Sequence, residues 1–309
     1  MRYLDLSQPI NEGIPVYPGD PLFESRPFAE HETDGFRGTR YVVGSHLGTH
    51  IDAPFHFFLD GESLDAFPVE FFNGQAACLN LAPLVGSDSP RYRERGDLSR
   101  PVALTVSDLA PFEPIFESAP IVLLRVGWSS RVGTTEYYDD FPSLSPDVCD
   151  WLADYPKLRI LGLETPSLVA TPGDPAIASE SETPSTAAAK FDPELGEFLP
   201  QDRALNEDAR PSEPNRDAET LARPLDELEL LADAECHRIL LGRRPPILIL
   251  EGLVNLESLP RYERPEDGAS VAVDPARVFE LSCYPLPILG ADGCPVRAVA
   301  RIESPLELS

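Results

Sequence analysis

Short apolar runs recur along the chain and predict a strand-rich fold. Most of them are rich in Val, Ile and Leu and are bounded by Gly, Pro or Asp, as is typical of β-strands. The predicted strands lie at residues 3–7, 40–46, 76–81, 119–128, 158–164, 246–254, 278–286 and 296–302.

Two segments carry a helical pattern instead. The first begins at Ser145, with Pro146 at the first helical position and Asp147 in the first turn, and runs to Asp154. The second covers about residues 225–241, where the apolar residues follow helical spacing. Since strands outnumber helices, the pattern predicts an α+β or layered β/α domain. A Gly-rich phosphate loop and a G-x-S-x-G nucleophile turn are both absent from the sequence.

The composition changes between residues 168 and 224. This segment is rich in Pro, Ser, Ala and acidic residues and poor in apolar ones, which is typical of a disordered or loosely packed insertion. We therefore predict one domain over residues 1–309 that is interrupted by this acidic insertion. The insertion is interpreted as an expendable loop, with a partner-binding role as the alternative.

The net charge indicates which binding partners are unfavourable, and the cysteine content indicates the cellular compartment. The net charge of −27, with only two lysines, makes nucleic acid and anionic membranes poor partners. No run of eighteen apolar residues indicates a membrane span, and the N-terminal segment does not resemble a signal peptide. Five scattered cysteines without a C-x-x-C pair predict reduced, mostly buried thiols. We therefore expect a cytoplasmic protein.

The stretch SHLGTHIDAPFHF at residues 45–57 holds three of the five histidines. His46, His50, Asp52 and His56 all occupy even positions, so an extended chain would point them to one side. A straight strand would separate the first and last by roughly 33 Å, so the chain must bend. Gly and Pro residues within the stretch permit such a bend. Imidazole with carboxylate is the ligand set of Zn²⁺, Mn²⁺ or Fe²⁺ rather than Ca²⁺ or Mg²⁺, so we predict a metal site here.

Residues 46–56 match the motif H-x-G-T-H-x-D-x-P-x-H at every defined position, and with it the chain resembles the metal-dependent cyclase-like hydrolase family. This family includes bacterial kynurenine formamidase and isatin hydrolase. Similar segments include IPVYPGDP, LLRVGW, LGLETPS, HRILL, ILEGL and GADGCPVRA, and only residues 168–224 lack a recognised counterpart. The resemblance implies a layered β/β/α, swivelling-domain-like fold.

The resemblance also implies roles for individual residues. His46 and His50 would hold one metal ion, and His237 would hold a second. Asp52 and Glu251 would bridge the two ions, which we expect to be Zn²⁺, with a single Mn²⁺ as the alternative. The residues nearest the substrate would be the proton-transferring His56 and the pocket-lining Tyr17.

Glu251 and His237 can also be interpreted from the sequence alone, without the resemblance. Glu251 ends the apolar run PPILILE, and a buried carboxylate needs a metal or a partner such as arginine. His237 alone would be interpreted as a packed core histidine. The sequence departs from the family at RRPP, which lengthens the gap between His237 and Glu251, and at Glu164, which replaces an aspartate.

The expected activity is hydrolysis of an aromatic amide. The metal would lower the pKa of a bound water, whose hydroxide attacks the carbonyl, and His56 would protonate the leaving nitrogen. N-formylkynurenine is the first substrate considered and an isatin-type cyclic lactam, cleaved with one metal ion, the second. The alternative from another class is a binding protein that kept the metal and lost catalysis. We further expect a homodimer or higher homo-oligomer.

Overall fold

The computed structural model describes residues 1–17, 19–94, 96, 101–170, 191–192, 197–198 and 227–303. The chain forms two compact units, of which the first comprises Met1–Pro172 with Asp226–Ser309 and the second Gly173–Leu225. In the second unit, β8 (Phe191–Asp192) pairs antiparallel with β9 (Glu197–Phe198). The larger first unit carries the candidate site.

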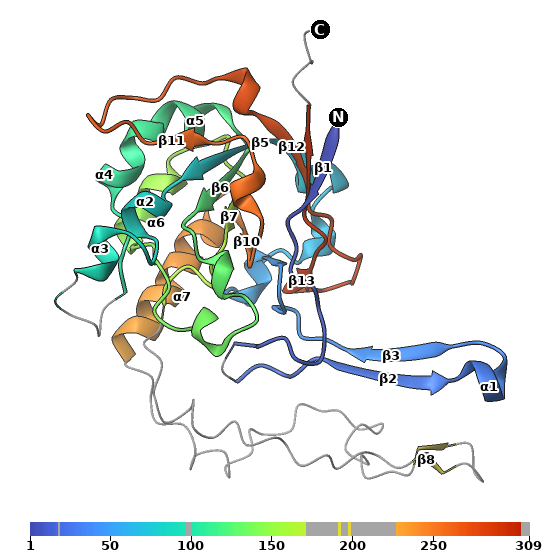
Figure 1. The fold of residues 1–309 in the computed structure, drawn as a ribbon. Helices are drawn as coiled ribbons and strands as arrows, with labels where there is room; N and C mark the ends of the chain where they lie inside the picture. Colours follow the sequence, from blue (N-terminus) through green and yellow to red (C-terminus); the bar gives the residue numbers. More distant parts are fainter. Residues whose placement is uncertain are drawn as a thin grey trace, which may run out of the picture. The chain divides into compact units, whose positions relative to one another are not determined.

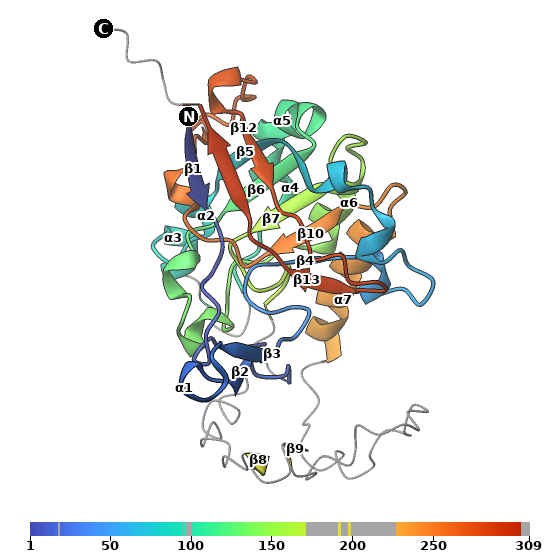
Figure 2. The ribbon, with the colours of Figure 1, turned by 90° about the vertical axis from the view of Figure 1, so that its right-hand side faces the viewer.

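A mixed, curled ten-stranded sheet forms the centre of the first unit (Figures 1 and 2). Its central strands β5, β6, β7 and β10 run parallel, while the strands on both sides of them pair antiparallel. Strands β6, β7 and β10 are almost entirely buried, which explains their continuous Val, Ile and Leu runs. The order of strands is β1 (Arg2–Asp5), β14 (Val299–Ile302), β12 (Phe279–Ser282), β5 (Asn73–Asn80), β6 (Ile121–Arg125), β7 (Ile160–Leu163), β10 (Leu248–Glu251), β4 (His50–Asp52) and β13 (Gly293–Pro295), with β11 (Tyr262–Glu263) beside β5.

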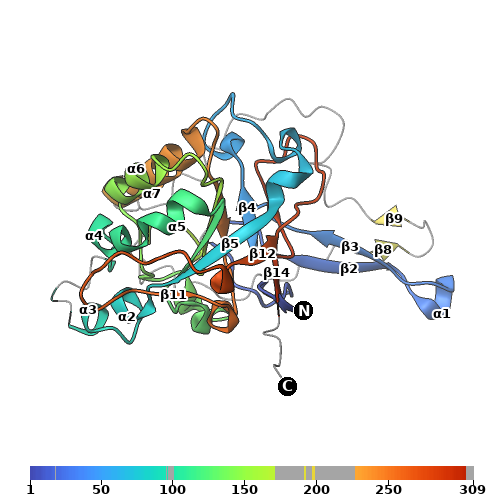
Figure 3. The same cartoon turned by 90° about the horizontal axis from the view of Figure 1, so that it is seen from above.

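Helices cover one side of this sheet, as Figure 3 shows for α4 to α7. The Ser145 hydroxyl caps α6 by accepting a hydrogen bond from Val148 N–H, which confirms the predicted start of this helix. The second predicted helix is α7. The α-helices are α1 (His31–Asp34), α2 (Ala82–Val85), α3 (Pro90–Arg93), α4 (Val106–Leu109), α5 (Glu113–Ser118), α6 (Pro146–Ala153) and α7 (Glu227–Gly242). The 3₁₀-helices lie at Pro54–His56, Leu64–Ala66, Val69–Phe72, Ala110–Phe112, Ser129–Arg131, Thr135–Tyr137, Leu256–Ser258 and Pro275–Arg277.

A separate hairpin projects from the first unit (Figures 1 and 3). Strands β2 (Glu24–Ala29) and β3 (Gly38–Val42) pair antiparallel, and α1 lies between them in the chain. The run predicted as a strand at 40–46 thus ends at Val42 and belongs to this hairpin instead of the main sheet. His31 begins α1 and is exposed.

The α+β class is confirmed, with a strand-rich sheet and helices on one side of it. Leu168, Val169 and Ala170, at the start of the predicted insertion, are buried in the core. Most of the remaining segment to residue 224 lies outside the described residues. All five cysteines are free and buried. No helix in the described part of the chain has both the length and the hydropathy that a membrane span needs.

Candidate metal centre

Strand β4 lies between β10 and β13 and carries the central residues of the site. In the antiparallel register Glu251 is opposite His50, and Ile249 is opposite Asp52. Since side chains alternate along a strand, His50, Asp52 and Glu251 all point to the same face of the sheet. All three are buried, with 1–3% of each residue exposed.

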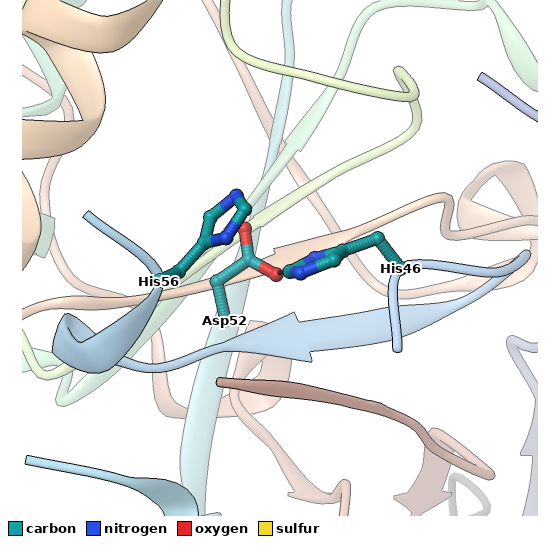
Figure 4. Close-up of side chains that lie close together, drawn as sticks. All are labelled: His46, Asp52 and His56. Atoms are coloured by element: carbon teal, nitrogen blue, oxygen red, sulfur yellow. Dashed lines mark hydrogen bonds and ion pairs between the residues drawn. The ribbon is translucent and has the colours of Figure 1, made fainter. Parts of the chain in front are cut away.

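The two flanking histidines reach this face because the chain bends on both sides of β4. Gly48 has φ of +63°, which glycine adopts without strain, and Pro54 begins a 3₁₀-helix that ends at His56. The His46 and His56 rings lie 4.0 Å apart between centroids, and Figure 4 shows the Asp52 carboxylate close to both of them. The predicted bend around a common point is therefore observed, with the strand itself confined to residues 50–52.

The backbone of β13 makes room for the His46 ring. A Cβ atom added to Gly293 would lie 2.6 Å from His46 Cε1, well inside van der Waals contact. Any side chain at residue 293 would therefore displace the His46 ring.

The two carboxylates present their oxygens to different histidines. Asp52 Oδ1 lies 2.8 Å from His46 Nδ1 and 3.5 Å from His50 Nε2, whereas Oδ2 lies 3.8 Å from His237 Nε2. Glu251 Oε2 lies 3.3 Å from His50 Nε2, and Oε1 lies 3.6 Å from His237 Nε2. The donors thus form two neighbouring groups that share Asp52 and Glu251.

The three histidines that face Asp52 and Glu251 are His46, His50 and His237. Each of them has a hydrogen-bond partner outside the cluster at its other ring nitrogen. His46 Nε2 lies 3.0 Å from Asp292 Oδ2, and His50 Nδ1 lies 3.0 Å from the Gly48 carbonyl oxygen. His237 Nδ1 lies 2.8 Å from the carbonyl oxygen of Asp233. Metal-binding histidines in proteins typically have such a partner, because it sets the tautomer and the ring orientation. His56 Nδ1 is farther from its nearest carboxylate, at 3.7 Å from Asp292.

Burial and the neighbouring charges act in opposite directions on the pKa values of this cluster. Burial lowers the pKa of His46, but Asp52 and Asp292 outweigh it and raise the pKa to about 11. The same opposition, with Asp233 and Glu251 prevailing, raises the pKa of His237 to about 10. Burial raises the pKa of Asp52, yet the histidines around it bring the pKa below its usual range. Burial, the largest influence on His56, lowers its pKa.

These residues fit a divalent metal ion. Glu251 Oε1 is buried and has no hydrogen-bond partner, which is costly for a carboxylate oxygen unless a cation meets it. His50, Asp52 and Glu251 offer ligand atoms that all lie within 4.8 Å of one another, as do His46, Asp52 and His56. Imidazole nitrogen combined with carboxylate oxygen suits Zn²⁺ or Mn²⁺.

The RRPP departure does not displace His237. The Arg243 side chain anchors the extra loop to the segment that follows α6, where it donates hydrogen bonds to the carbonyl oxygens of Tyr155 at 2.5 Å and of Leu158. The loop is therefore accommodated at the C-terminal end of α7, while His237 lies one turn or more earlier, against both carboxylates.

Glu164 and Tyr17 lie outside the ligand set. The buried Glu164 carboxylate accepts hydrogen bonds from Val126 N–H at 2.7 Å and from the Ser129 hydroxyl at 3.1 Å, so it holds a loop in place. Burial raises the pKa of Glu164. Tyr17 is half-buried and packs edge-to-face on Tyr138, with 6.0 Å between ring centroids.

Two aspartates of the centre were missed from the sequence. Asp292 lies within the block GADGCPVRA, where no spacing pattern singles it out. Asp233 lies four residues before His237 on α7, and this spacing on one helix face was the available signal. Its carboxylate is held by the Ser167 hydroxyl at 3.0 Å and by Val169 N–H at 2.9 Å.

Sequence comparison relates the chain to known proteins. Residues 4–169 match the model of a family described as "Putative cyclase". The kynurenine formamidase of Geobacillus thermodenitrificans is 24% identical over 300 residues, which cover 97% of this chain and 97% of that protein. The kynurenine formamidase of Bacillus thuringiensis (strain Al Hakam) is 28% identical over 168 residues, or 54% of this chain and 70% of that protein.

Solved structures share the fold. Isatin hydrolase A from Labrenzia aggregata, bound to benzyl benzoate, superposes with a TM-score of 0.62 at 20% identity, over 98% of this chain and 94% of that one. Isatin hydrolase A from Ralstonia solanacearum gives a TM-score of 0.61 at 20% identity, over 98% and 92% of the two chains.

Proposed function

The chain belongs to the cyclase family, and from this premise we propose that it is a metal-dependent hydrolase that cleaves the amide of a small aromatic formamide. One observation carries this proposal: three histidines turn one nitrogen toward Asp52 and Glu251 while outer partners hold the other nitrogen. A fourth histidine, His56, lies beside this set with a partly exposed side chain. Such a set combines ligands for a metal with a group for proton transfer.

The residues that would hold the metal fall into two groups. His46 and His50 would bind one ion and His237 the other, with Asp52 and Glu251 bridging, because each carboxylate turns one oxygen to each group. We propose Zn²⁺ at both positions. A single Mn²⁺ on His46, His50 and Asp52 is the alternative, and it would leave the buried Glu251 Oε1 without a partner.

A bound divalent ion supplies Lewis acidity, which lowers the pKa of water and polarises a carbonyl oxygen. His56 serves the proton transfers. Its Nδ1 faces Asp292, so Nε2 is available to take a proton from the attacking water and to deliver it to the leaving nitrogen. Protonation is required because an amide anion is too basic to depart, and a neutral imidazole both accepts and donates near pH 7.

The substrate is proposed to be N-formylkynurenine, with an isatin-type lactam as the second candidate. Phe57 stacks on His237 with 4.6 Å between ring centroids and suits a planar aromatic ring, and we propose that Tyr17, which packs on Tyr138, lines the same pocket. The curated relatives that match along the chain are named kynurenine formamidases.

The test compares both substrates on one protein preparation. The protein is stripped with a chelator, reconstituted with Zn²⁺ or Mn²⁺, and assayed on N-formylkynurenine and isatin side by side. We expect metal-dependent release of kynurenine and formate that His56→Ala reduces while metal content stays unchanged. The matched control is His31→Ala, which removes an exposed histidine and is expected to change neither metal content nor turnover.

Other outcomes redirect the proposal. Faster cleavage of isatin, with one ion per chain, favours the lactam hydrolase. Metal binding without turnover on either substrate favours the metal-containing binding protein. Activity that survives complete metal removal contradicts the metal mechanism.

We further propose that the enzyme acts in the cytoplasm as a homodimer or higher homo-oligomer, without nucleic acid or membrane partners. The free, buried state of all five cysteines supports a reducing compartment.

A further inference from the structure

An exposed arginine lies at the edge of the metal centre without a counterion. Arg238 directly follows His237 on α7, and its Cζ atom lies 5.6 Å from the centroid of the Phe57 ring. Glu235 lies three residues earlier on the same helix, a spacing that allows an ion pair, yet no ion pair joins the two side chains. Among the described residues, no other carboxylate forms an ion pair with Arg238 either. Its positive charge is therefore available to a ligand.

Phe57 connects Arg238 to the histidines of the centre. The Phe57 ring stacks on His237 with 4.6 Å between ring centroids, and it contacts the His56 ring edge-to-face at 4.5 Å. The Phe57 N–H donates a hydrogen bond to the Pro54 carbonyl oxygen at 3.1 Å, which fixes this residue at the end of the 3₁₀-helix. The Arg238 guanidinium is thus separated by one aromatic ring from the candidate proton-transfer residue and from a candidate metal ligand.

Packing against α7 holds Phe57 in this position. The next residue, Phe58, lies against Gly242, because a Cβ atom added to Gly242 would lie 3.0 Å from Phe58 Cζ. Phe57 and Phe58 therefore contact α7 at two successive turns. A guanidinium over an aromatic ring is attracted to the face of the ring and still has N–H groups free at its edges. These groups can donate two parallel hydrogen bonds to one carboxylate.

The charge balance of the centre indicates an anionic ligand for Arg238. Four carboxylates lie around the histidines of the centre, namely those of Asp52, Asp233, Glu251 and Asp292. With neutral histidines, two divalent ions would balance these four negative charges, so the charge of Arg238 would remain uncompensated. A chain of net charge −27 repels anions at long range, and a local cation favours their binding at one place.

We propose that Arg238 is a specificity-determining residue that binds the carboxylate of an aromatic amide substrate, while Phe57 contacts the apolar part. This inference rests on the proposed function and deepens it. N-formylkynurenine carries its formamide on the aromatic ring and a carboxylate at the far end of its amino-acid side chain. The formamide would lie at the metal centre beside His56, and the carboxylate at Arg238. Isatin has no carboxylate, so Arg238 favours the formamide over the lactam.

The test compares three formamides on the protein reconstituted with Zn²⁺. They are N-formylkynurenine, its methyl ester, and 2′-formamidoacetophenone, which keeps the ring, the ketone and the formamide but lacks the amino-acid end. We expect Arg238→Gln to lower kcat/KM for N-formylkynurenine by about 10–100-fold, the range for a hydrogen bond to a charged group, and to do so through KM. The other two formamides should be hydrolysed equally by both proteins, because they offer no carboxylate.

Two further variants serve as controls. Arg238→Lys keeps the charge but loses the planar pair of donors, so it should recover part of the loss in kcat/KM for N-formylkynurenine. Arg93 is an exposed arginine on α3 that pairs with Asp88, and Arg93→Gln should match the wild type on all three formamides. Elemental analysis should give the same metal content for every variant.

A binding measurement separates this inference from the proposed function. Calorimetry should show that kynurenine binds Arg238→Gln about 10–100-fold more weakly than wild type, with no such difference for kynurenine methyl ester. If the wild type hydrolyses none of the formamides, the proposed function fails, and the binding result still decides the role of Arg238. Equal losses for acid and ester, no loss for either acid in Arg238→Gln, or no binding of kynurenine to the wild type would overturn the inference.

Discussion

Asp292→Asn tests directly how much a partner outside the ligand set contributes to metal affinity. Its Oδ2 lies 3.0 Å from His46 Nε2, on the side of the ring opposite to Asp52. Asp292→Asn keeps the shape of the side chain but removes the negative charge. His46 then keeps at most a neutral hydrogen bond at Nε2, and its Nδ1 becomes a weaker metal ligand.

The expected loss of metal affinity follows from the role of Asp292 as the partner of His46 Nε2. Removing an outer partner of a metal-binding histidine typically lowers metal affinity about 10–100-fold, or roughly 1.4–2.8 kcal/mol. Asp292 has a 39% exposed side chain, so water replaces part of its interaction. We therefore expect a loss of about 10-fold, confined to the ion held by His46 and His50.

The assay titrates metal-free protein with Zn²⁺ against a chromophoric chelator at pH 7. Wild type should show two binding steps, and Asp292→Asn should weaken one of them. Asp154→Asn is the control, since Asp154 is an exposed aspartate at the end of α6. Asp292→Glu should recover part of the affinity.

Three results would refute this reasoning. The first is Zn²⁺ affinity within twofold of wild type in Asp292→Asn. The second is an equal loss in both binding steps, which would indicate a general change of the centre. The third is a lower melting temperature of the metal-free variant, which would assign Asp292 to folding instead.

Four other predictions concern separate parts of the molecule. His56→Ala should retain metal and lose about 10²–10⁴-fold in turnover, and loss of metal would make it a ligand instead. His237→Ala should reduce zinc from two ions to one per chain by elemental analysis, and an unchanged count of one in both proteins would contradict the second position. Burial raises the pKa of Asp108, but the Arg91 guanidinium at 2.7 Å and the Thr105 N–H outweigh burial, so the pKa is lowered in the folded state. The ionised Asp108 therefore stabilises the folded state above about pH 4, and this stabilisation is lost as pH falls through the folded-state pKa. Asp108→Asn should thus cost about 1–3 kcal/mol at pH 7 and progressively less below pH 4, measured by urea unfolding at each pH. Deletion of residues 173–225 should leave turnover unchanged, because their composition is too poor in apolar residues to form a core, and an inactive but folded deletion would contradict this.

Local patterns in the sequence determined the buried strands, the start of α6 and the part of the site within residues 46–56. Continuous apolar runs predicted β6, β7 and β10, since strands buried on both faces need apolar residues at every position. Ser145 and Pro146 predicted the start of α6 through capping, which acts within one turn. The motif at residues 46–56 predicted a bend around a common point, because glycine and proline act on the backbone where they stand.

Only the tertiary structure decided which distant residues join this motif. Asp292 reaches His46 because β13 pairs with β4, and His237 reaches Asp52 and Glu251 because α7 packs beside β10. Neither of these contacts has a periodic or compositional signal, since each joins segments far apart in the chain. The spacing of Asp233 and His237 on one helix face is a signal for their mutual contact, but it does not show that this face meets the centre.

The strand predicted at residues 40–46 shows the same limit. Its β-branched and aromatic residues indicated extended chain, and β3 is indeed extended. Such a run does not show which strand will pair with it. Among the described residues β3 pairs only with β2 and carries the exposed Tyr41 on a projecting hairpin, because pairing depends on backbone hydrogen bonds and space that the whole fold provides.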